Sequence, residues 1–158
     1  MDFRIPFGVR GHKYTEEEIA TTVTVMHGEA PLTQGACLHE FESRFRRYAG
    51  VEHAFAVSSA TAALEITAQL CQFEAGDEVI IPAHTYTSSA YPFVKAGATP
   101  VWADIDPDTR VVRAETISAC ISSRTRAVVV PHLYGFGVDM TPIMALAEER
   151  QIIVIEDA

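Results

Sequence analysis

Short apolar segments and amphipathic segments alternate along most of this chain, and this alternation limits the fold more than any other feature. The apolar segments have the length of strands, and most are bounded by Gly, Pro or Asp; they cover residues 53–58, 78–82, 99–104, 126–132 and 152–156. Segments with helical spacing of apolar residues cover 16–26, 38–49, 61–73, 87–96, 114–122 and 140–150. The sequence therefore predicts an α/β fold, with a mostly parallel sheet that helices cover on both faces.

The composition is that of a globular, acidic chain. With 158 residues and 48% hydrophobic side chains, the chain is long enough to bury a core. Its 12 Lys and Arg against 21 Asp and Glu give a formal net charge of −9, which leaves no basic surface for nucleic-acid phosphates or anionic lipid. The longest apolar runs fall far short of the ~20 residues of a membrane span, and the first residues lack the apolar stretch of a secretory signal. We therefore expect a cytoplasmic protein that binds neither nucleic acid nor membrane.

The residues that directly follow the strands are the candidates for a ligand site. Ligands of open α/β sheets bind beyond the carboxyl ends of the strands, next to helix N-termini. Residues 58–64, SSATAAL, place small side chains at a helix start, where backbone N–H groups can contact a phosphate; a simple Ser or Thr helix cap explains them equally well. Tyr86 follows the second strand, and its ring could lie over a flat ligand or belong to the core.

Charged and titratable residues lie at the ends of later strands. The last strand ends on Glu156 and Asp157. A carboxylate there can cap a helix or form a salt bridge, but a buried carboxylate needs a partner, and a cationic ring nitrogen is one such partner. His84 and His132 also lie near strand ends, where histidines most often satisfy local hydrogen bonds, and they are candidates for substrate contacts.

Two other ligand motifs are incomplete. Four acidic residues between 104 and 115 fit positions of a calcium-loop template, but Thr109 replaces the required Gly and Pro107 interrupts the loop. Residues 135–137, GFG, begin a dinucleotide fingerprint, but Met140 stands at the third glycine position. We therefore expect no metal site and no dinucleotide site.

Six motifs, in this order and spacing, resemble the nucleotide-sugar aminotransferases of the DegT/StrS type. These are pyridoxal-phosphate (PLP) enzymes of fold type I, in the aspartate aminotransferase superfamily. The motifs are VSSATAAL, GDEVIIPAHTYTSSA, AGATPVWADIDPDT, SSRTRAVVVPHLYG, the Asp139-Met140 pair and IIVIEDA. The earlier segments PLTQG and FESRF extend the resemblance over nearly the whole chain. Each motif alone is weak, but six collinear motifs indicate kinship.

The resemblance implies cofactor contacts at three places between residues 60 and 157. The segment SATA would hold the cofactor phosphate through Thr61 and the backbone around Ala60 and Ala62, and Tyr86 would stack on the pyridine ring. Asp157 would pair with the pyridine nitrogen and keep it protonated, so that the cofactor can accept the electrons of a substrate carbanion.

The last two acids are not equivalent in this interpretation. Neighbouring strand residues face opposite sides of a sheet. With Asp157 directed at the cofactor, we expect Glu156 to point away, toward a surface or structural contact.

The resemblance also implies an activity and partners. The expected reaction moves an amino group from an amino acid, glutamate in the family, to a keto-sugar carried on a nucleotide, in the biosynthesis of polysaccharide or antibiotic sugars. The family's active site is shared across a homodimer. Two alternatives stay open: a PLP-dependent sugar dehydratase that has replaced the lysine, and a non-catalytic protein that uses the fold for binding or regulation.

The lysine content of the chain leads us to expect a longer protein. Fold type I catalysis requires a lysine that forms the Schiff base and moves the proton, but only Lys13 and Lys95 are present and neither matches it. We therefore expect the amino-terminal part of a larger enzyme, with that lysine beyond residue 158. Residues 1–50 would form an N-terminal helical segment and active-site loop, and 51–158 part of the PLP-binding large domain, without the small C-terminal domain.

Overall fold

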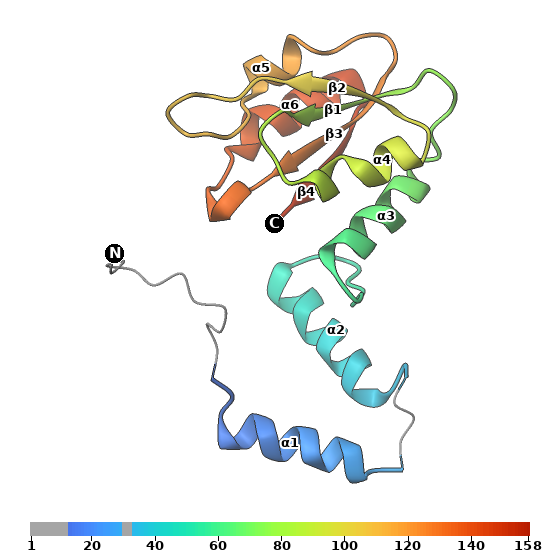
Figure 1. The fold of residues 1–158 in the computed structure, drawn as a ribbon, viewed down its shortest axis with the longest axis vertical. Coiled ribbons are helices and arrows are strands. Elements are labelled where there is room, and N and C mark those ends of the chain that lie inside the picture. The colour runs from blue at the N-terminus through green and yellow to red at the C-terminus, as the bar shows by residue number, and fades with distance from the viewer. Residues whose placement is uncertain (1–12, 30–32) are drawn as a thin grey trace, which may run out of the picture. The chain divides into compact units, whose positions relative to one another are not determined.

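The computed structural model of the chain describes residues 13–29 and 33–158, which divide into two compact units (Figure 1). The first unit ends at Ala56, and the second comprises Val57–Ala158. Part of the motif PLTQG lies outside the described residues. The division that the sequence suggests between residues 50 and 51 stays a prediction about domains.

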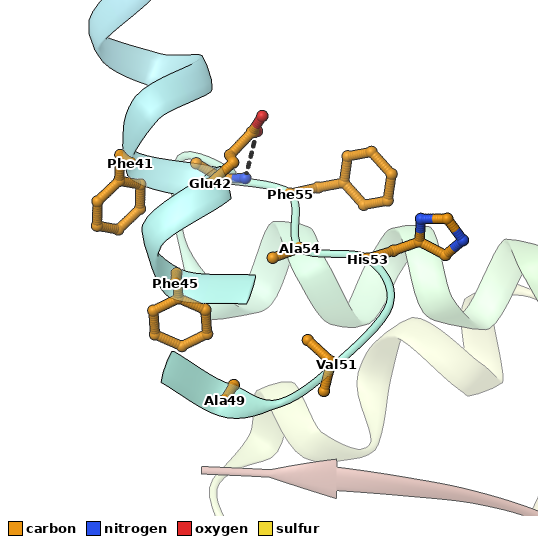
Figure 2. A pocket seen from close by; sticks show the side chains of 9 residues that line it. Phe41, Glu42, Phe45, Ala49, Val51, His53, Ala54 and Phe55 are labelled. Atoms are coloured by element: carbon orange, nitrogen blue, oxygen red, sulfur yellow. Dashed lines mark hydrogen bonds between the residues drawn. The ribbon is translucent and has the colours of Figure 1, made fainter. Parts of the chain in front are cut away.

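The first unit contains α1 (Glu16–His27) and α2 (Ala36–Ala49). A capping box begins α1: the Thr15 side chain accepts the Glu18 N–H at 3.2 Å, and the Glu18 carboxylate accepts the Thr15 N–H at 2.6 Å. Gly50 ends α2 with a φ of 68°, a left-handed conformation that glycine adopts without steric cost. This turn sends the chain back along α2 toward Phe55 (Figure 2).

The strand predicted at residues 53–58 does not form. A strand satisfies its backbone N–H and C=O groups by pairing with a neighbouring strand. Within the described residues no strand pairs with this segment, and the Ala56 N–H instead donates to the Glu42 carboxylate at 2.9 Å (Figure 2). The sequence prediction is wrong here, because an apolar pattern does not supply the partner that a strand needs.

The second unit is built on a parallel sheet with the strand order β2-β1-β3-β4 (Figure 1). Its strands are β1 (Glu78–Pro82), β2 (Thr99–Ala103), β3 (Thr125–Pro131) and β4 (Ile153–Asp157). All pairings among them are parallel, which confirms the predicted α/β class. The chain adds β2 on one side of β1 and then β3 and β4 on the other. The strand order therefore reverses between β1 and β3, and ligands of open α/β sheets bind at the carboxyl ends of such strands.

Helices cover both faces of this sheet, as predicted. They are α3 (Ala60–Leu70), α4 (Tyr91–Lys95), α5 (Ala114–Ser118) and α6 (Met140–Arg150). Side chains of α3 and α4 pack with Ile81 and Ile155 in one buried cluster, while side chains of α5 and α6 pack with Ile80 and Val128 in another. Adjacent residues of one strand thus enter opposite cores. No helix in the described part of the chain is long and apolar enough to span a membrane.

The helix predicted at residues 87–96 is divided into two short helices. A 3₁₀ helix, η1 (Thr87–Ser89), follows β1, and α4 begins at Tyr91. Pro92 lies in the first turn of α4, where its missing N–H costs nothing, whereas its ring would clash with an earlier carbonyl in one continuous helix. The break leaves Ser89 at the end of a separate short helix close to the carboxyl end of β1.

Candidate active site

The carboxyl ends of β1, β3 and β4 collect predicted site residues at one edge of the sheet. His84 and Tyr86 follow β1, His132 follows β3, and Asp157 is the last residue of β4. Pro131 and Asp157 are paired in register, and the His132 N–H donates to the Asp157 carbonyl at 2.9 Å. The edge that parallel topology predicts for a ligand site therefore does hold polar side chains.

The Asp157 carboxylate is half-buried and is held on one side. Its Oδ2 accepts a hydrogen bond from the Ser89 Oγ at 2.6 Å, and the Ser89 Oγ accepts one from the Thr85 Oγ1 at 3.0 Å. The other carboxylate oxygen, Oδ1, has no hydrogen-bond partner among the described residues. One oxygen thus remains able to accept a hydrogen bond from a ligand.

Sequence reasoning missed Ser89 and Thr85. Both belong to the motif PAHTYTSSA, in which the sequence singled out only His84 and Tyr86. Their signal was a set of hydroxyl side chains in the turn after a strand, at the same sheet edge as Asp157. That signal is weak, because hydroxyl residues are common in any turn.

Tyr86 is not a core residue. Its side chain is 73% exposed, and the residue occupies the N-cap position of η1, in the turn that follows β1. An exposed aromatic ring in this position can stack on a planar ligand, which is what the sequence suggested as one of two uses.

The first turn of α3 combines both predicted uses of the SSATAAL segment. The Ser59 Oγ accepts the Ala62 N–H at 3.1 Å, and the Ser59 carbonyl accepts the Ala63 N–H at the same distance. The N–H groups of Ala60 and Thr61 have no acceptor among the described residues. A capped helix start that keeps free N–H groups, at the positive end of the helix dipole, can bind an anion.

The direction of α3 brings its first turn toward the edge of the sheet where the parallel strands end. The helix leads through a short connection into β1 and packs on the sheet beside η1 and β4. It therefore runs opposite to the strands, and its N-terminus is directed to the edge where the parallel strands end.

Glu156 and His132 form a pair on the other face of β4. The His132 Nε2 lies 3.1 Å from the Glu156 Oε2, and the His132 Nδ1 accepts the Val138 N–H at 3.1 Å. Glu156 thus points away from the Asp157 side and contacts another side chain. Both ring nitrogens of His132 are occupied by protein partners.

His84 is more open. Its side chain is exposed, its Nδ1 lies 3.4 Å from the Arg110 carbonyl, and its ring centroid lies 6.5 Å from that of Tyr134. Its Nε2 has no partner among the described residues. A role of either histidine toward a substrate stays a prediction.

Lys95 does not provide a nucleophile at this edge. Lys95 ends α4, where its Nζ lies 3.1 Å from the Glu65 carboxylate of α3. This hydrogen bond and the charge of Glu65 raise the Lys95 pKa, which makes the free amine scarcer. Lys13 lies in the first unit, before α1.

The calcium-like loop is occupied by its own polar groups. The Asp106 Oδ1 accepts the N–H groups of Asp108 and Thr109 at 2.9 and 2.8 Å, and the Oδ2 lies 3.0 Å from an Arg113 nitrogen. The bond from the Thr109 N–H, foremost among these contacts, lowers the Asp106 pKa. Within the described residues no group of three or more His, Cys, Asp or Glu could hold a metal ion.

A separate hollow lies in the first unit, between α2 and the segment that follows it (Figure 2). It has a volume of about 280 Å³, and its walls are mostly apolar: Phe41, Glu42, Phe45, Ala49, Val51, His53, Ala54, Phe55 and Ala56. None of the predicted site residues lines it.

Known proteins resemble this chain in sequence and in fold. Residues 13–158 match the DegT/DnrJ/EryC1/StrS aminotransferase family. The GDP-perosamine synthase of Caulobacter vibrioides is 43% identical over 124 residues, which are 78% of this chain and 33% of that protein. An aminotransferase from Psychrobacter cryohalolentis is 33% identical with a TM-score of 0.85, over 96% of this chain and 38% of the other.

A further similar protein has been solved in its PLP form. A protein from Streptococcus pneumoniae assigned as a sugar aminotransferase, solved in its PLP form, is 31% identical with a TM-score of 0.81; the match covers 90% of this chain and 36% of that one. The chain thus spans about a third of the length of the curated relative. The family match covers nearly every residue described above, including the whole candidate site, and the chain belongs to the DegT/DnrJ/EryC1/StrS aminotransferase family.

Proposed function

We propose that residues 1–158 are the amino-terminal part of a PLP-dependent aminotransferase that acts on a keto-sugar linked to a nucleotide. Family membership and the GDP-perosamine synthase relative support amino transfer to such a sugar, and the relative in its PLP form supports the cofactor. The amino donor that we expect is glutamate. The observation that carries the proposal is the Asp157 carboxylate at the end of β4, bonded to Ser89 through one oxygen and free at the other.

The polar groups of the site match the chemistry of PLP. The cofactor has an anionic phosphate, a flat aromatic ring and a basic ring nitrogen. The free N–H groups of Ala60 and Thr61 suit the phosphate, the exposed ring of Tyr86 suits the pyridine, and the Asp157 carboxylate suits a protonated nitrogen. The small side chain of Ala62 leaves room for the phosphate to approach the helix.

Each residue has a distinct part in this proposal. When bound, PLP supplies an electron sink for the carbanion that forms as the amino acid loses its α-proton. Asp157 accepts a hydrogen bond from the ring nitrogen and stabilises the positive charge there. The Thr61 hydroxyl and the first amides of α3 bind the phosphate, and Tyr86 fixes the plane of the ring. His84 and His132 stay candidates for the substrate side.

Assembly and location follow from the family in the same proposal. We expect a homodimer whose two copies share their active sites, in the cytoplasm, without a nucleic-acid or membrane partner. A dimer is consistent with a site that this chain leaves open on the side of Tyr86, whose ring is 73% exposed.

The test uses the complete protein with PLP, L-glutamate and a panel of GDP-, dTDP- and UDP-linked keto-sugars. Mass spectrometry should detect an amino sugar nucleotide, formed together with 2-oxoglutarate, and the Asp157→Asn variant should form almost none. Loss of water from the sugar without amino transfer would favour the dehydratase, and sugar binding without conversion would favour the non-catalytic protein. The sequence beyond residue 158 should contain a lysine that PLP modifies and borohydride traps.

A further inference from the structure

Ser89 has a buried hydroxyl that joins two distant parts of the sheet. Its side chain belongs to a residue that is 1% exposed, and it lies 2.6 Å from the Asp157 Oδ2. Ser89 ends η1 after β1, Asp157 ends β4, and β3 lies between these two strands. The hydrogen bond therefore crosses one intervening strand at the edge where the ligand would bind.

The hydrogen bonds around Ser89 have one direction. Each hydroxyl has a single proton, and the Thr85 Oγ1 donates its proton to the Ser89 Oγ at 3.0 Å. The Ser89 proton is then available for the Asp157 Oδ2 alone, and an ionised carboxylate can only accept. Thr85, Ser89 and Asp157 thus form a chain of donors that ends on the carboxylate, and successive bonds in such a chain strengthen one another.

The chain of hydrogen bonds also selects which carboxylate oxygen meets a ligand. Because Oδ2 accepts from Ser89, rotation of the Asp157 carboxylate is restricted, and Oδ1 is left without a partner among the described residues. The same short helix begins after Tyr86, which is its N-cap residue.

We propose that Ser89 is a positioning residue, which orients the Asp157 carboxylate toward the ring nitrogen of the cofactor with the support of Thr85. This inference rests on the proposed function. It assigns a role to a residue that does not touch the cofactor, and it predicts that removing the Ser89 hydroxyl acts through the ring nitrogen.

The experiment measures dissociation constants of the complete protein for PLP and for 1-deaza-PLP, in which a C–H replaces the ring nitrogen. Ser89→Ala should weaken PLP binding roughly 10-fold and change 1-deaza-PLP binding by less than about 2-fold. Ser88→Ala is the matched control, since Ser88 is the neighbouring residue and its hydroxyl has no partner among the described residues. Ser89→Thr keeps the hydroxyl and should restore PLP binding.

Two further comparisons show whether an effect of Ser89→Ala comes from the lost hydrogen bond or from a folding defect. Thr85→Val removes only the donor to Ser89, and it should weaken PLP binding roughly 2- to 3-fold without changing 1-deaza-PLP binding. In an Asp157→Ala background, Ser89→Ala should have no additional effect on PLP binding, because the carboxylate that it orients is gone.

The outcomes distinguish this inference from the proposed function. If the wild-type protein prefers PLP over 1-deaza-PLP but Ser89→Ala weakens both equally, or neither, Ser89 has no positioning role and the placement of the cofactor still holds. If the wild-type protein binds no PLP, or does not distinguish the two cofactors, the pairing of Asp157 with the ring nitrogen is wrong and the inference is overturned with it.

Discussion

Replacing Asp157 by alanine or by asparagine separates its structural role from its chemical one. Alanine removes the acceptor of the Ser89 hydroxyl. Ser89 is only 1% exposed, and its hydroxyl lies 2.6 Å from the carboxylate. A buried donor left without an acceptor lowers the free energy of unfolding by about 1–3 kcal/mol. Asparagine keeps an oxygen at nearly the same place but loses the charge, so this variant should lose about 1 kcal/mol of unfolding free energy or less.

The two variants should differ in stability but not in turnover. Neither alanine nor asparagine can stabilise a positive charge on the ring nitrogen, so both variants should lose activity, on the order of 100-fold by comparison with other electrostatic catalytic groups. The complete protein without cofactor gives the free energy of unfolding from urea denaturation, and the same preparations with PLP give kcat. Glu148→Ala, which removes an exposed carboxylate on α6, is the control.

Two results would contradict this reasoning in different places. Asp157→Asn with nearly wild-type kcat would show that the negative charge is not used. Asp157→Ala with wild-type stability would show that the Ser89 hydroxyl does not depend on this acceptor.

The other predictions concern the anion site and a buried acid. Thr61→Val should weaken PLP binding by about 1.5–3 kcal/mol, the worth of one hydrogen bond to a charged group, and Ala62→Leu should weaken it further by blocking the backbone; fluorescence titration of the complete protein measures both, and an unchanged dissociation constant would refute the placement. Hydrogen bonds from Ser122 and then Arg124 lower the Glu78 pKa, so the stability that Glu78 contributes is present above its unfolded pKa and is lost as the pH falls through its folded pKa. Glu78→Gln should therefore lose less unfolding free energy between about pH 7 and pH 3 than the wild type does. Equal losses would show that the ionised form of Glu78 does not stabilise the fold.

Two of the strands that the sequence predicted correctly, β1 and β3, are buried between two layers of helices. Residues 126–132 correspond to β3, which is Thr125–Pro131, and its central valines are fully buried. Burial on both faces produces a continuous apolar run, which is visible in the sequence alone. Residues 53–58 have a similar pattern, but whether they form a strand depends on a partner strand elsewhere, which no local pattern reveals.

The positions of the candidate site residues could be predicted for the same topological reason, and only in part. Asp157 ends β4, Tyr86 follows β1, and parallel strands end at one edge, so a list of strand ends already includes both candidates. The bond from Ser89 to Asp157 joins residues 68 positions apart. Sequence periodicity cannot predict such a contact, because it results from the packing of η1 against the end of β4.

His132 illustrates what the structure adds to a residue that the sequence located at a strand end. The Val138 N–H donates to its Nδ1, so that nitrogen has no proton, and the Nε2 proton is directed to Glu156. These two bonds hold the ends of the loop between His132 and Val138, in which Tyr134 has a left-handed φ of 57°. A left-handed tyrosine costs about 1–3 kcal/mol and persists only where the surroundings fix it. Tyr134 is 84% exposed and lies beside the His84 ring, so the loop that His132 holds carries an exposed aromatic ring to the residues that follow β1.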